Sequence, residues 1–206
     1  LKKRIEAKIF SSEHHLSHIY NAVLSSKIKS ANIFSVDGFG DFVSTIAATL
    51  KNNKIFINKK IYYPNSLGIF YQGMTQLVGF KNFGDEYKLM GMSAFGKYNE
   101  EIETKLKKLV SIDEFGNFKL NLKYYNFTKF SSAIKSNKNS EIFNNYAYSL
   151  FKQNKKNKNF DSKYVKDIAY NTQLYFEKIL FEFILKNSNA KNKNIILTGG
   201  CAQNSK

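Results

Sequence analysis

The stretch ANIFSVDGFGD, residues 31–41, decides the fold class of this chain. It joins an apolar run, residues 31–36, to a short segment that holds two glycines and two aspartates. A short apolar run bounded by turn residues predicts a buried strand, and the Asp-Gly and Gly-Asp pairs predict a turn. Residues 42–50 then read as a returning strand and Lys54–Tyr62 as a third, with Asn52-Asn53 as the second turn. The sequence therefore predicts a hairpin or meander.

Helical patterns flank this meander on both sides along the chain. Apolar residues at helical spacing predict helices over residues 14–27, 67–78 and 163–186, with Ser66 as the cap of the second, and residues 100–110 read as a polar helix. Ser11 or Ser12 is the expected cap of the first helix. The last helix leads into a short strand at residues 194–198 that ends in Gly199-Gly200. Strands that alternate with helices indicate an α/β or mixed-sheet fold.

Two regions are less regular. Residues 79–97 are rich in glycine and charge, which predicts a loop that serves a site. Residues 111–163 are rich in Asn and Lys and weakly patterned. We expect them to form a peripheral insertion with short strands and a helix near residues 141–151.

Composition narrows the classes of function. The 206 residues carry a formal charge of +16, but Arg4 is the only arginine, and recognition of bases and phosphates favours the guanidinium fork. Abundant Asn, Ile, Phe, Tyr and Lys reflect an AT-rich coding sequence, so we do not expect nucleic acid as a partner. The single cysteine, Cys201, excludes a disulfide framework and fits a cytoplasmic protein, in which we expect the thiol to pack rather than react. No apolar run predicts a membrane span.

All three histidines fall at positions 14, 15 and 18. His14 and His18 are four residues apart, a spacing that places both imidazoles on one face of a helix. With Asp37 at the end of the predicted strand, they would form a set of two imidazoles and one carboxylate, which suits Fe(II), Zn(II) or Mn(II) with open positions. The alternative is three histidines that are merely solvated or packed. A zinc protease is disfavoured because the glutamate of HExxH is absent.

A second group of candidate residues could bind a nucleotide. Backbone N–H groups in the turn at Gly199 and Gly200 could receive phosphate or ribose hydroxyls, and Asn204 could present its amide to a ribose or base. Lys88 could bind a phosphate or form a surface ion pair. The glycines beside Asp37, Gly38 and Gly40, complete the candidate cofactor-binding residues.

Several blocks together point to a family. EHHLSH, SVDGFGD, YPNSLGIFYQGMTQLVGF with DEYKLMGMSAFGK, and NIILTGGCAQN follow one another along the chain. In this order they resemble the carbamoyltransferases of the nodulation and antibiotic-tailoring type. The resemblance covers core blocks 12–100 and 164–206 and implies a transferring domain with an actin-like ATPase, ribonuclease H-like fold. That fold is related to the tRNA threonylcarbamoyl transferases, and we expect this chain to hold it incomplete at both ends.

The resemblance also implies roles for residues. His14, His18 and Asp37 correspond to metal ligands, with Fe(II) as the first expectation, and a further ligand aspartate is expected beyond Lys206. The glycine pair and Asn204 match the block that lines the nucleotide cleft, where ATP or carbamoyl-adenylate would bind. Residues 86–88 are expected only to lie near the site. Carbamoyl phosphate would be used by an adenylate-forming domain outside this chain, so the chain alone should lack full activity.

The leading hypothesis is thus a fragment of a cytoplasmic O-carbamoyltransferase that moves a carbamoyl group from carbamoyl-adenylate to a hydroxyl of a sugar or natural product. A sugar-kinase-like ATPase on the same fold and a basic nucleic-acid-binding module are the alternatives. We expect a small-molecule hydroxyl acceptor as partner, with a homodimer as a further option. No residue is assigned as a catalytic base.

Overall fold

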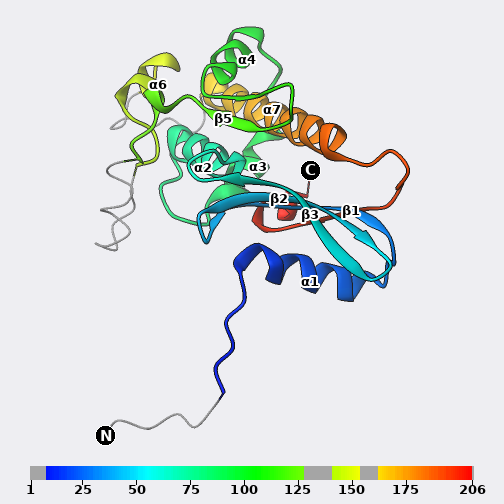
Figure 1. The fold of residues 1–206 in the computed structure, drawn as a ribbon. Helices are drawn as coiled ribbons and strands as arrows, with labels where there is room; N and C mark the ends of the chain where they lie inside the picture. Colours follow the sequence, from blue (N-terminus) through cyan, green and yellow to red (C-terminus); the bar gives the residue numbers. More distant parts are fainter. Residues whose placement is uncertain (1–7, 128–140, 154–161, 206) are drawn as a thin grey trace, which may run out of the picture.

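The computed structural model describes residues 8–127, 141–153 and 162–205. Its centre is a four-stranded mixed sheet in the order β3-β2-β1-β6, with helices on both faces (Figure 1). The first three strands form the predicted antiparallel meander, and the last strand pairs in parallel with β1. The strands span β1 Ala31–Gly40, β2 Val43–Lys51, β3 Lys54–Tyr62 and β6 Ile195–Thr198. The prediction of a mixed sheet with flanking helices is confirmed.

Alternation along β1 decides what each face of the sheet contacts. Side chains of a strand point to opposite faces in turn. Phe34 and Val36 enter the larger core, whereas Ile33 enters a smaller core on the opposite face. Ser35 and Asp37 share the face of Ile33, and each contacts a histidine of the helix on that side. One strand therefore supplies both an apolar face and a polar face.

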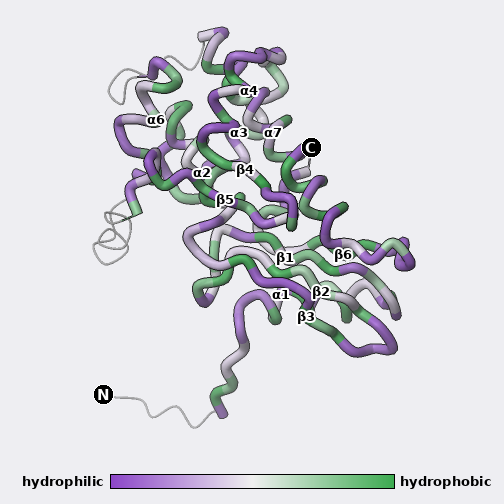
Figure 2. Tube along the Cα trace, turned by 45° about the horizontal axis from the view of Figure 1, so that its top comes forward, coloured by the Kyte–Doolittle hydropathy of each residue, from purple (hydrophilic) through white to green (hydrophobic). Residues whose placement is uncertain are grey.

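The larger core lies between the sheet and several helices. They are α2 Leu67–Val78, α3 Glu86–Ser93, α4 Glu100–Lys107 and α7 Lys163–Asn187 (Figure 1). Aromatic side chains fill much of it; Phe34 of β1, for example, meets Phe183 of α7 edge-on at 5.6 Å between ring centroids. Figure 2 shows hydrophobic residues along β1, whereas the far end of the β2–β3 hairpin is hydrophilic.

One helix, α1 His14–Ser26, covers the opposite face of the sheet (Figure 1). Its fully buried Ile19 packs into the smaller core with apolar residues of β1, β2 and β6. The helix begins after Glu13, whose carboxylate accepts a hydrogen bond from the backbone N–H of Leu16 at 2.7 Å. The expected serine cap is therefore wrong, because a carboxylate three residues before Leu16 satisfies the same free N–H group.

Two further local predictions are corrected. The β1 strand continues through Gly38 and Gly40, and the turn to β2 is the pair Asp41-Phe42 instead of the glycines. A register shift between Val36 and Gly40 absorbs the extra residues. Within the predicted loop 79–97, eight residues form α3, which is short enough for glycine to mask its pattern.

The segment 111–163 contributes more buried side chains to the larger core than a peripheral insertion would. It holds most of the small hairpin β4 Val110–Ile112 and β5 Phe118–Leu120, the 3₁₀ turn η1 Leu122–Tyr124 and the helix α6 Asn145–Leu150. Phe118, Phe143 and Phe151 are fully buried and belong to the larger core. Residues 128–140 and 154–161 of this segment lie outside the described residues. Among the described helices, none is long and apolar enough to cross a membrane.

Candidate metal centre

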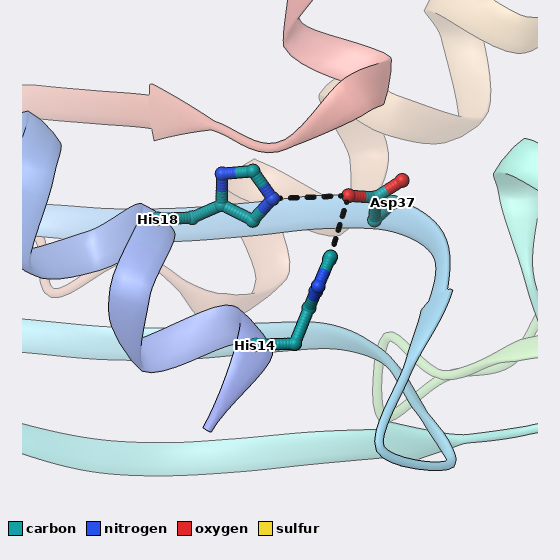
Figure 3. Close-up of side chains that lie close together, drawn as sticks. All are labelled: His14, His18 and Asp37. Carbon is teal, nitrogen blue, oxygen red and sulfur yellow. Dashed lines mark hydrogen bonds and ion pairs between the residues drawn. The ribbon is translucent and has the colours of Figure 1, made fainter. Parts of the chain in front are cut away.

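The structure brings His14, His18 and Asp37 together (Figure 3). The two histidines lie one turn apart on α1, and the aspartate lies on the facing strand β1. The Nε2 atoms of His14 and His18 lie 3.1 and 3.2 Å from the same oxygen of Asp37, Oδ2. All three potential ligand atoms lie within 4.8 Å of one another. The helical spacing and the strand alternation thus converge on one point, as the sequence predicted.

The two nitrogen–oxygen distances are those of direct hydrogen bonds or ion pairs, and they also fit a shared cation. Ligand atoms about 2.1 Å from one metal lie roughly 3.0 to 3.4 Å apart at octahedral to tetrahedral angles. Both nitrogen–oxygen distances fall in this range. Two imidazoles and one carboxylate form a donor set for Fe(II), Zn(II) or Mn(II). The side chains of His14 and His18 are 40% and 36% exposed, so the open side of the group leaves room for further ligands.

Glycines allow neighbouring segments to approach this group closely. A Cβ on Gly40 would lie 2.1 Å from the ring of His14, and one on Gly200 would lie 2.8 Å from Asp37 Oδ1. At Gly68, near the start of α2, a Cβ would lie 2.7 Å from the backbone nitrogen of Gly38. Side chains at these positions would push the ligands apart.

The glycine pair after β6 has a clear structural role. Gly199 adopts a φ of 92°, a conformation that strongly favours glycine, and a Cβ there would lie 2.4 Å from the carbonyl oxygen of Val36. The backbone N–H of the next residue, Gly200, favours the ionised carboxylate and helps to lower the pKa of Asp37. The turn therefore holds the carboxylate, and the nucleotide-binding role of the pair remains a prediction.

Several hydrogen bonds fix Asp37 in place. The backbone N–H of Gly38 donates to Asp37 Oδ1 at 2.7 Å, and the hydroxyl of Ser66 donates to the carbonyl of Asp37 at 3.1 Å. Burial opposes ionisation of Asp37, but the hydrogen bonds from His14, Gly38 and Gly200 outweigh it and hold its pKa below the usual value. The group is therefore an anion at neutral pH, which is the form that binds a metal.

His15 has a different role from its two neighbours. It is fully buried, with Nδ1 2.8 Å from the hydroxyl of Ser35 and Nε2 3.0 Å from the carbonyl of Val43. Because the carbonyl can only accept, Nε2 carries the hydrogen and Nδ1 accepts from Ser35. Burial lowers the pKa of His15, so the ring is neutral. It fastens α1 to β1 and β2.

Two of the remaining predicted cofactor residues, Lys88 and Asn204, already have protein partners. The ammonium of Lys88 lies 2.7 Å from Asp85 Oδ1. Asn204 and Gln173 exchange two side-chain hydrogen bonds, and Tyr71 donates to Gln173 at 2.7 Å. Gly38 leaves open space where a Cβ would be. The proposed nucleotide contacts of these residues stay predictions.

Other supporting residues were not predicted to serve the site. Ser66 was expected only as a helix cap, Gly68 was not singled out, and Ser35 was read only as part of a strand. Contacts from distant segments give no signal in spacing along the chain. For Ser35 the alternation with Asp37 on one strand face was a usable signal.

Cys201 packs against the larger core as predicted, and burial raises the pKa of its thiol.

The comparison with protein families identifies the class of protein to which this chain belongs. Residues 1–206 match the family described as the carbamoyltransferase N-terminus, so the chain belongs to the carbamoyltransferase family. The uncharacterized protein MJ1051 of Methanocaldococcus jannaschii is 33% identical over 208 residues, which cover 100% of this chain and 36% of that protein.

Two nodulation proteins are similar over shorter stretches. NolNO of Sinorhizobium fredii is 32% identical over 90 residues, 44% of this chain and 13% of that protein. NolO of Bradyrhizobium diazoefficiens is 35% identical over 85 residues, 40% of this chain and 15% of that protein. The match with each of these relatives thus spans between 13% and 36% of the relative's length.

Proposed function

We propose that this chain is part of the carbamoyl-transferring domain of an O-carbamoyltransferase. In this proposal the full-length protein makes carbamoyl-adenylate from ATP and carbamoyl phosphate and passes the carbamoyl group to a small-molecule hydroxyl. His14, His18 and Asp37 hold a divalent metal, Fe(II) first and Zn(II) or Mn(II) as alternatives. The observation that carries the proposal is the convergence of both imidazoles on one carboxylate oxygen in a chain of this family.

The strand arrangement supports an actin-like ATPase, ribonuclease H-like fold. Three meandering strands are followed by helices and by a fourth strand, β6, parallel to β1 on its far side. In such mixed sheets ligands bind beyond the carboxyl ends of neighbouring parallel strands. Asp37 follows the part of β1 that pairs with β6, and Gly199 directly follows β6. The proposed metal ligand and the proposed nucleotide turn thus share one edge.

The residues of this chain would perform three tasks. A metal held by the three ligands supplies positive charge to bind the adenylate phosphate and polarise the transferred carbonyl. Asp37, held as an anion by Gly38 and Gly200, keeps both imidazoles directed to one point. His15 fixes the angle of α1, so that His14 and His18 face the strand.

The transfer itself balances without an added redox partner. The acceptor hydroxyl oxygen bonds to the carbamoyl carbon, and the bond from that carbon to the adenylate phosphate oxygen breaks. AMP leaves with the electron pair, and the hydroxyl proton passes to water or to the released phosphate. The products are a carbamate ester and AMP.

The test uses the full-length protein with ATP, an acceptor panel, and carbamoyl phosphate either present or omitted. We expect AMP and a carbamoylated acceptor only when carbamoyl phosphate is present. Asp37→Asn should lower the rate at least about 100-fold, because the anion that gathers the ligands is lost. Asp113→Asn, a carboxylate change on the β4–β5 hairpin, is the control and should retain the rate. Phosphorylated acceptor without carbamoyl phosphate would instead establish a sugar-kinase-like ATPase.

A further inference from the structure

Polar side chains from three distant segments form one hydrogen-bonded network beside the turn that follows β6. They are Tyr71 of α2, Gln173 and Glu177 of α7, and Asn204 directly after the 3₁₀ turn η2 Gly200–Gln203. Gln173 lies at the centre of the network and is only 2% exposed. Tyr71 is also buried, whereas Glu177 and Asn204 are half-buried. The network therefore connects the buried sides of two helices to a group near the surface.

The hydrogen bonds of Gln173 have defined directions. Gln173 Nε2 donates to Glu177 Oε1 at 2.7 Å, and a carboxylate only accepts, so the amide cannot turn over without losing this bond. Tyr71 donates to the other polar atom of the amide, Oε1, also at 2.7 Å. Burial raises the pKa of Tyr71, so its hydroxyl keeps the proton that it donates. Both neighbours therefore fix the orientation of Gln173.

Gln173 in turn fixes the amide of Asn204. Gln173 Nε2 donates to Asn204 Oδ1 at 2.9 Å, and Asn204 Nδ2 donates to Gln173 Oε1 at 3.0 Å. If the Asn204 amide turned over, oxygen would face oxygen and N–H would face N–H, and both hydrogen bonds would be lost. Glu177 thus decides, through Gln173, which way the Asn204 amide faces.

This network does more than attach η2 to α7. An apolar side chain at position 173 could also attach the turn, whereas a buried amide costs free energy unless its polar atoms are bonded. What a bonded network adds is a single orientation of its members. Asn204 belongs to the same short segment as Gly200, where a Cβ would lie 2.8 Å from Asp37 Oδ1. The oriented amide therefore lies only four residues along the chain from a contact of the proposed metal centre.

We propose that Gln173 is a positioning residue for the nucleotide and acts by fixing the orientation of the Asn204 amide. This inference rests on the proposed function, because it takes Asn204 as a contact of the adenylate. A group that is already oriented loses less conformational freedom when a ligand binds, so the affinity for the ligand is higher. Glu177 and Tyr71 contribute by holding Gln173.

The test measures the binding of AMP to the full-length protein by titration calorimetry. Gln173→Met keeps the length of the side chain and removes both polar atoms of the amide. A paired exchange, Gln173→Glu with Glu177→Gln, keeps the net charge and a hydrogen bond between positions 173 and 177, but removes the donor to Asn204 Oδ1. Glu182→Gln, at a side chain of α7 that is 39% exposed, is the matched control.

Further measurements separate this site from the rest of the protein. The part of the AMP signal that Asn204→Ala weakens reports on the site in this chain. Pyrophosphate release from ATP with carbamoyl phosphate reports on the adenylate-forming domain, and thermal unfolding shows whether each variant is folded. Neither pyrophosphate release nor metal content should change in any variant.

We expect the affinity for AMP to fall about fivefold in Gln173→Met and in the paired exchange, and to stay unchanged in Glu182→Gln. Because Gln173 acts through Asn204, Gln173→Met should change the affinity less than about twofold when Asn204→Ala is already present. Tyr71→Phe removes one donor and keeps the ring, so it should weaken AMP binding about twofold.

Several results would overturn the inference. One is an unchanged affinity in Gln173→Met or in Asn204→Ala, and another is a parent that binds no AMP. A fivefold loss that persists in the Asn204→Ala background would also overturn it, since Gln173 would then act only on the fold. If the changes at Gln173 prevent folding, an unchanged affinity in Tyr71→Phe decides against it. A parent that binds AMP but forms no carbamoylated acceptor would instead refute the proposed function alone.

Discussion

The two faces of the central sheet use the same strands for different purposes. On one face Phe34 and Val36 enter a large aromatic core beneath α2 and α7. On the other face a single helix, α1, packs on a smaller core and carries a polar group at its first turn. The first face stabilises the fold through its large buried apolar area, whereas the second holds a few polar side chains at defined distances from one another. The contrast shows why the candidate site lies where the apolar core is thin.

The three histidines repeat this contrast within one helix. His15 is fully buried and has two hydrogen-bond partners, so it acts as a structural group. His14 and His18 are partly exposed and face one carboxylate. The burial of each imidazole and the group that it contacts therefore decide its role.

The largest effect should follow from opening the large core. Phe34→Ala should lower the free energy of unfolding by about 3–5 kcal/mol, since Phe34 is fully buried against Phe183. Urea unfolding of the full-length protein measures the loss. Phe181→Ala on α7 is the control; its ring is 64% exposed, so the change should stay within about 0.5 kcal/mol. Equal losses of stability in both variants would mean that burial of Phe34 in the larger core does not stabilise the fold, and this would contradict the contrast drawn between the two faces.

A smaller effect, confined to the other face, is expected for His15→Ala. The change leaves the Ser35 hydroxyl and the Val43 carbonyl without their partner and should cost about 2–3 kcal/mol. Hydrogen exchange should accelerate in α1, while α2 and α7 keep their protection. If exchange rose equally in all three helices, α1 would not be a separately fastened element.

The smallest of these effects concerns the approach of the β6 turn to Asp37. Gly200→Ala would place a Cβ 2.8 Å from Asp37 Oδ1, so the carboxylate must move. Metal affinity should fall about 10-fold to 100-fold, as is typical when groups that orient ligands are disturbed. Gly38→Ala is the matched control, because nothing lies within 4 Å of its added Cβ. Equal affinities in the two variants, measured by competition with a chelator, would remove this role of Gly200.

Sequence patterns predicted the elements that depend on local periodicity. The helices α1, α2 and α7 follow from apolar spacing, the meander follows from apolar runs and turn residues, and α4 was read as a polar helix. The convergence of His14, His18 and Asp37 follows from helical and strand periods. The exact turn was mispredicted because two glycines in DGFGD gave a stronger turn signal than Asp41-Phe42. Here the sheet register prevailed over local propensity.

Contacts between distant segments could not be predicted. The approach of Gly68 and Gly200 to residues 37–38 depends on how α2 and β6 pack on β1, and one sequence contains no signal for that distance. Glu13 caps α1 although two serines precede it, because its carboxylate reaches the N–H of Leu16. The choice between Glu13 and the serines depends on where the chain meets the sheet.

The most direct test of the central claim is the metal content of the purified full-length protein. Elemental analysis would compare the parent with His14→Ala, Asp37→Ala and the control Asp113→Asn. The account predicts about one metal ion per chain in the parent and in the control, and a strong loss in both ligand variants. Unchanged iron or zinc content in His14→Ala and Asp37→Ala would contradict it.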